Sequence, residues 1–123
     1  MRFVLFTYPD PDYAERWPSL SEEEHAAEIA EHNVWFAKYG DGIRGGANLA
    51  FPKVIRTVRR RAGQPVTTDG PFVETKEILG GLIIVEVDGW DEATAMAEEW
   101  PSLEQGPGAG VQVEAVIDHS ADA

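Results

Sequence analysis

Cysteine is absent from the 123 residues of this chain. Its absence excludes a disulfide framework, a thiolate nucleophile and a cysteine metal site, and it agrees with a reducing compartment. Long apolar runs are absent as well: the run that starts at Phe3 is too short for a signal peptide, and no stretch approaches the length of a membrane span. We therefore expect a cytoplasmic protein that has no membrane partner.

Positive charge is scarce. The chain has 10 Lys+Arg against 22 Asp+Glu, which gives a formal net charge of -12 at pH 7. Such a protein repels polyanions as a whole, and it has few cations with which to release counterions from a phosphate backbone. Nucleic acid is therefore not expected as a partner. The remaining composition, 43% hydrophobic and 26% charged, is that of one ordinary folded domain over residues 1–123.

Motifs for nucleotide binding and for serine nucleophiles are also missing. The chain has no Gly-x-Ser-x-Gly sequence, and its Gly-Gly pairs at 45–46 and 80–81 lack both the G-x-G-x-x-G pattern and a P-loop lysine. A metal site built from His25, Glu28 and His32 is poorly spaced for zinc, because two helical turns separate the two rings by on the order of 10 Å. We therefore expect neither a cofactor nor a metal.

Hydrophobic periodicity predicts the order β-α-β-β-α-β with an extra hairpin arm in the middle. The expected strands are 2–8, 43–49, 54–60, 66–68, 82–85 and 111–117, and the expected helices are about 22–39 and 90–100. Residues 9–18 are expected to form a loop whose Tyr13 and Trp17 pack over an edge. A flexible loop is expected at 105–110 and a flexible tail at 118–123.

The first helix has clear sequence signals. Ser21 and Glu24 form a capping box at its start, and Gly40 is its expected stop. Residues at spacings i, i+4, i+7 and i+11 make one stripe along it. This stripe consists of His25, Ile29, His32 and Phe36. Two histidines therefore share the face that is expected to meet the sheet.

The fold class that this order predicts is α+β, a ferredoxin-like split β-α-β with an inserted β-hairpin. Strands 2–8 and 82–85 are apolar on both faces and are expected to pair at the centre of the sheet. Two helices cover only one sheet face. A second copy of the chain is the simplest cover for the other face, so we expect a homodimer.

The run from Thr68 to Gly81 contains a turn signal, Asp69-Gly70-Pro71-Phe72, in which Asp bonds its own backbone, Gly accepts unusual dihedral angles and Pro fixes φ. With Glu74-x-Lys76-Glu77 after it, the run resembles the DGPF motif of the YCII-related family. The strand 3–8, the helix with an internal His and the Gly45-Gly46 segment agree with this resemblance. It implies a dimeric α+β barrel of two ferredoxin-like sheets.

The resemblance also implies a His–Asp pair in an apolar cleft. Carried over to this chain, the pair is His32 and Asp69, with His25 as the alternative histidine. A neutral imidazole that a carboxylate orients is suited to general acid–base catalysis. The residues expected to bind substrate are Phe6, Phe36, Gly70 and Phe72. A related member is a dehydrochlorinase acting on a chlorinated hydroxyquinol, so the implied function is that of a small-molecule lyase, isomerase or dehydrochlorinase-like enzyme.

Each of these assignments has an alternative. His32 is equally well explained as a satisfied core histidine, and Asp69 as a residue that caps its own turn. The alternative function is a non-catalytic ligand-binding or regulatory dimer linked to a sigma factor, as the family's frequent pairing with sigma factors suggests. The ligand is expected to be a small molecule, aromatic or anionic. The basic segment 53–61 holds Lys53, Arg56, Arg59, Arg60 and Arg61. Such a segment is usually a solvated hairpin, and its alternative role in an acidic protein is to attract an anionic substrate.

Overall fold

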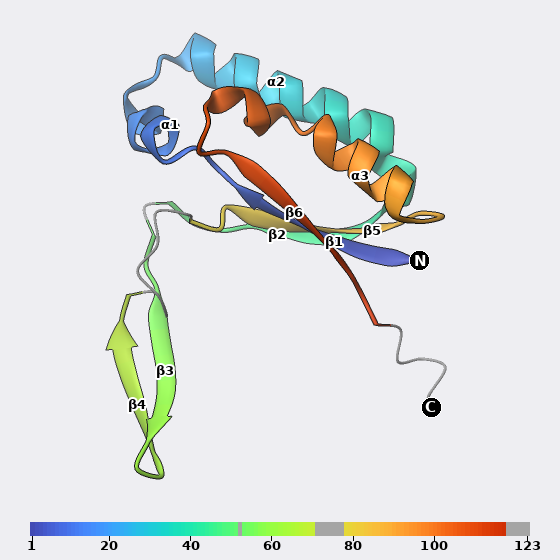
Figure 1. The fold of residues 1–123 in the computed structure, drawn as a ribbon. Coiled ribbons are helices and arrows are strands. Elements are labelled where there is room, and N and C mark those ends of the chain that lie inside the picture. Colours follow the sequence, from blue (N-terminus) through green and yellow to red (C-terminus); the bar gives the residue numbers. More distant parts are fainter. Residues whose placement is uncertain (52, 71–77, 118–123) are drawn as a thin grey trace.

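The computed structural model describes residues 1–51, 53–70 and 78–117. Helices lie over one face of an antiparallel sheet, and a hairpin projects from the sheet's edge (Figure 1). The chain is thus α+β and ferredoxin-like with an inserted hairpin, as the periodicity predicts. The expected tail at 118–123 lies outside the described residues.

The sheet has the order β2-β5-β1-β6, with all neighbours antiparallel. Its strands are β1 (Arg2–Tyr8), β2 (Ile43–Asn48), β5 (Gly81–Glu86) and β6 (Gly110–Ala115). The central pair is β1 with β5, as expected from their apolar sequences. In their register Val4 lies opposite Ile84 and Phe6 lies opposite Leu82. These four side chains therefore share one sheet face, because side chains alternate along a strand.

Helices α2 (Glu22–Tyr39) and α3 (Trp90–Glu98) cover the other face. The predicted capping box is present: Ser21 Oγ accepts from Glu24 N–H at 3.1 Å, and Glu24 Oε1 accepts from Ser21 N–H at 3.2 Å. The core lies between helices and sheet. It consists of Phe3, Leu5, Trp35, Ile83, Val85, Ala93, Met96 and Ala97.

The helix stripe takes a different place from the expected one. Trp35 is the buried residue of α2, and its indole N–H donates to Met96 O at 2.9 Å, joining α2 to α3. Ile29 and Phe36 of the stripe remain 54% and 40% exposed. The stripe therefore faces an open space beside the core, because Trp35, one position from Phe36, supplies the packing against α3.

The expected loop at 9–18 is wrong. Residues 11–16 form helix α1 (Pro11–Arg16), and a 3-10 turn, η1 (Trp17–Ser19), follows. Asp10 is the N-cap, with its Oδ2 accepting from Tyr13 N–H at 3.1 Å. Pro11 suits the first helical position because the N–H there would have no partner inside the helix, and proline has no N–H. The prolines thus start the helical turns in this segment.

Two further 3-10 turns occur, η2 (Gly40–Gly42) and η3 (Pro101–Gln105). The first continues α2, because Gly40 keeps right-handed helical dihedral angles. The second follows α3, which ends at Glu98, so Trp100 lies outside the helix in which it was expected. Within the described part of the chain, no helix is both long and apolar enough to cross a membrane.

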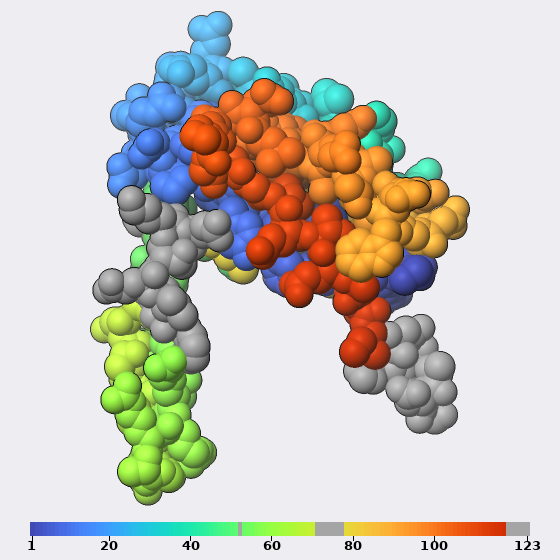
Figure 2. All heavy atoms as spheres, in the orientation of Figure 1, coloured from blue at the N-terminus to red at the C-terminus, as the bar shows by residue number. Residues whose placement is uncertain are grey.

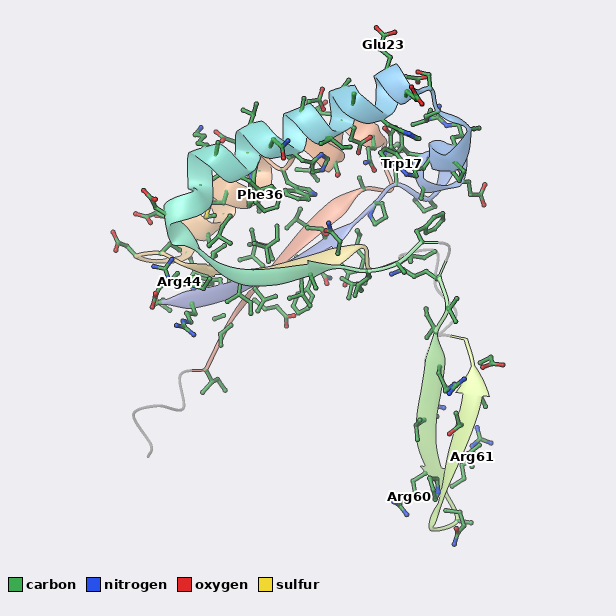
Figure 3. All side chains as sticks on the ribbon, turned by 180° about the vertical axis from the view of Figure 1, so that it is seen from behind. Trp17, Glu23, Phe36, Arg44, Arg60 and Arg61 are labelled. Carbon is green, nitrogen blue, oxygen red and sulfur yellow. The ribbon has the colours of Figure 1, made fainter. Side chains whose placement is uncertain are left out.

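The hairpin arm consists of β3 (Arg56–Arg61) and β4 (Gln64–Asp69), which form a separate sheet. Its turn uses positive φ angles at Ala62 and Gly63, as tight hairpins require. Strand β3 begins at Arg56, two residues later than expected, and Val54 before it is 96% exposed. The arm stands away from the rest of the molecule (Figure 2), with Arg60 and Arg61 near its tip (Figure 3).

Candidate functional site

A cavity of about 510 Å³ lies between α2, α1 and the end of the sheet where β1, β2 and β5 meet. Its aromatic walls come from α1, η1 and α2, from the residue before η3 and from the segment after β2. Phe36 points from α2 toward the sheet (Figure 3). The described aromatic residues that line it are Tyr13, Trp17, Phe36, Phe51 and Trp100. The described polar residues are Thr7, Glu28, His32, Asn33, Asn48, Lys53, Ser102 and Gln105. A cavity of this size and composition is typical of small-molecule sites.

His32 lines this cavity with both ring nitrogens engaged. Its Nδ1 lies 2.8 Å from Glu28 O, and its Nε2 lies 2.9 Å from Ser102 Oγ. A carbonyl oxygen only accepts, so Nδ1 carries the proton. In the neutral ring Nε2 then accepts from the Ser102 hydroxyl. The ring also makes a T-shaped contact with Trp100, with centroids 4.9 Å apart.

Glu28, one helical turn before His32, is held by two neighbours. Its Oε2 accepts from the Tyr13 hydroxyl, and its Oε1 accepts from Gln105 Nε2 at 2.8 Å. Burial and, after it, the hydrogen bond to the Glu28 carboxylate together raise the pKa of Tyr13 to about 12. Tyr13 therefore remains a donor, and the carboxylate stays fixed in the wall.

Asp69 is not brought to His32 within the chain. It ends β4, opposite Arg56 in the arm's register, and it is not among the described residues that line the cavity. Gly70 follows at a φ of 107°, and its N–H donates to Ile55 O at 2.9 Å. The backbone carbonyl of Glu28 orients the His32 ring, a role that was expected of the Asp69 carboxylate.

The other expected residues divide between the two sheet faces. Phe36 lines the cavity. Phe6 lies on the opposite sheet face, because Phe3, Leu5 and Thr7 of the same strand are buried toward the helices. Phe72 lies outside the described residues.

His25, the alternative histidine, lies outside this cavity wall. Its Nε2–H donates to Trp17 O at 2.6 Å, and its ring stacks on Trp17 with centroids 4.2 Å apart. Its described contacts thus join α2 to η1. No group of three or more metal-ligating side chains is found among the described residues.

Ser102, Tyr13 and Gln105 were not expected at the site. Ser102 meets a histidine 70 residues away along the chain, and Gln105 meets a glutamate 77 residues away. The signal that pointed toward this place was the stripe on α2, of which Ile29, His32 and Phe36 all line the cavity.

Fold and cavity together define a class: a ferredoxin-like α+β protein with an aromatic-walled cavity and a histidine in its wall. The YCII-related domain model matches residues 1–117. The chain belongs to the YCII-related family, as the DGPF resemblance indicates.

Two similar proteins extend this comparison. An uncharacterised protein of Rhizobium meliloti (strain 1021) is 30% identical over 101 residues, which cover 80% of this chain and 79% of that protein. The solved structure of 5-chloro-2-hydroxyhydroquinone dehydrochlorinase (TftG) from Burkholderia phenoliruptrix AC1100, in complex with 2,5-dihydroxybenzoquinone, is similar with a TM-score of 0.54. Its sequence identity is 19%, and the match covers 95% of this chain and 94% of that one. That likeness supports the fold.

Proposed function

We propose that this protein is a small-molecule enzyme of the lyase or isomerase kind and that His32 is its acid–base residue. One observation carries the proposal. His32 lines an aromatic cavity with its tautomer set by Glu28 O and its Nε2 beside the Ser102 hydroxyl. A positioned imidazole of known tautomer in an apolar cavity is what general acid–base catalysis requires.

The chemistry follows from the tautomer. Nε2 takes a proton from the substrate, either directly or through the Ser102 hydroxyl, which also lines the cavity. In a lyase the leaving group then departs with its bonding electrons, and the imidazolium later releases the proton. In an isomerase the same proton returns to a different substrate atom. The Glu28 carbonyl accepts from Nδ1–H throughout and keeps the ring in place.

The dehydrochlorinase with the similar fold supports this class of reaction. Elimination of hydrogen chloride needs a base for the proton and a route for chloride, and His32 meets the first need. Asp69 stays a predicted member of the site, although within the chain it forms no hydrogen bond with His32.

The test is a turnover assay on 5-chloro-2-hydroxyhydroquinone and on a panel of small lactones. In His32→Asn we expect turnover of an accepted substrate to fall about a hundredfold or more with near-normal affinity. His25→Asn is the matched control, since His25 contacts Trp17 and not the cavity. Equal losses in both variants would contradict the role of His32. Asp69→Asn in the same assay tests the predicted pair.

A non-catalytic binding or regulatory dimer, which would serve a sigma factor, is favoured by one observation. Both His32 nitrogens are satisfied inside the chain, as in a structural histidine. Ligands that bind the parent protein without any turnover, together with a large loss of stability in His32→Asn, would favour this alternative.

The outer sheet face supports the homodimer. Val4, Phe6, Leu82 and Ile84 are adjacent there and only half-buried within one chain. An apolar patch in the middle of a sheet is stabilised when it is covered, and a second copy would make the dimeric α+β barrel.

A further inference from the structure

Lys53 is the one lysine or arginine among the described residues that line the cavity. It follows the aromatic wall residue Phe51 and precedes the arm. Its side chain is partly buried, and burial lowers its pKa because the ammonium loses part of its water. A partly desolvated cation is stabilised by any anion that reaches it.

The chain does not supply that anion in its described part. The ion pairs found there use Arg2, Lys38 and Arg44, and none uses Lys53. Glu28 lines the same cavity, but Tyr13 and Gln105 donate to its two oxygens. Among the described residues, Lys53 therefore has no carboxylate partner, and the carboxylate of Glu28 in the same cavity is already satisfied.

The cavity also limits what else the ligand can be. Trp17, Phe36, Phe51 and Trp100 offer flat apolar surfaces, and about 510 Å³ suits one ring with its substituents. We propose that the cavity binds a small aromatic anion, a carboxylate or a phenolate, whose charged head is held by Lys53 and whose ring lies against these aromatic side chains. This inference rests on the cavity being the working site, as proposed above, and not on its being catalytic.

The charge pattern sets the direction of binding. A ligand anion is attracted to Lys53 and repelled by the Glu28 carboxylate, so its head lies at the Lys53 side. The rest of the ligand then extends along the wall formed by Phe36 and Trp100 toward His32, whose ring packs edge-on against Trp100. Lys53 acts here as a specificity-determining residue, and His32 as the group that exchanges a proton.

The experiment is titration calorimetry with matched probes. Benzoate and 4-nitrophenolate represent the two anion classes, and benzamide and 4-nitroanisole are their neutral counterparts. We expect at least one anion to bind the parent protein about tenfold or more tightly than its neutral counterpart. In Lys53→Met that preference should disappear, in Lys53→Arg most of it should remain, and added salt should weaken it.

Lys38→Met is the control, since Lys38 pairs with Glu99 on the surface and does not line the cavity. The proposal is overturned if neither anion binds, if the neutral probes bind equally well, or if Lys53→Met and Lys38→Met behave alike. Anion binding without turnover would support the role of Lys53 and count against catalysis. Turnover without a preference for anions would support catalysis and contradict the role of Lys53.

Discussion

At the scale of single residues, the wall of the cavity is set by the Tyr13–Glu28 contact. The pKa of Tyr13 lies at about 12 in the folded protein, above the ordinary tyrosine value of 10.0, mainly because of burial. A raised pKa stabilises the fold below the unfolded value, and this stabilisation is lost as the pH rises from about 10 to about 12. Urea unfolding should therefore show that the parent protein loses more stability than Tyr13→Phe over this range.

Glu28→Gln is the control for this prediction. It removes the negative charge that opposes ionisation of Tyr13 while leaving the phenol in place. Between pH 10 and 12, Glu28→Gln should therefore lose less stability than the parent protein does. Parallel curves for the parent and Tyr13→Phe between pH 10 and 12 would show that this contact does not perturb the phenol.

At the scale of elements, helix α2 contributes cavity residues from Glu28 to Phe36. Its start depends on the reciprocal Ser21 and Glu24 bonds, which satisfy N–H groups that have no partner inside the helix. Ser21→Ala should lower the free energy of unfolding by about 1 kcal/mol. Chemical denaturation followed by circular dichroism measures this loss.

Ser21→Asn is the matched control, because asparagine also accepts at the N-cap and should retain most of the stability. An unchanged midpoint and slope in Ser21→Ala would show that the capping box contributes little here.

At the scale of the whole molecule, the uncovered sheet face predicts association. Sedimentation should give a mass of two chains at micromolar protein. Ile84→Lys places a charge in the middle of the patch that pairs Val4 with Ile84 and Phe6 with Leu82, and it should yield monomers. Val34→Lys is the control, since Val34 is already 70% exposed on α2. A parent protein that sediments as one chain refutes the dimer.

The sequence by itself determined the elements that have local signals. The capping box predicted the start of α2, runs that are apolar on both faces predicted β1 and β5, and alternation predicted β6, because these patterns depend on neighbours within a few residues. The apolar strands also predicted the pairing of β1 with β5. The DGPF run pointed to the family, which the match over residues 1–117 shows. The helix at 11–16 is not predicted, because proline usually breaks a helix, whereas here Pro11 takes the first helical position and Asp10 caps it.

Only the tertiary structure decided what surrounds His32. Its partner Ser102 comes from 70 residues along the chain, and no local pattern reports a contact at that separation. Trp35 packs against α3 and Phe36 faces the cavity, although both are aromatic neighbours in the sequence. Asp69 lies on an arm whose two strands form a sheet of their own, so its position relative to His32 depends on how the hairpin leaves the main sheet. Packing between distant segments chose these neighbours, because burial depends on the whole fold and not on the residue's own surroundings in the chain.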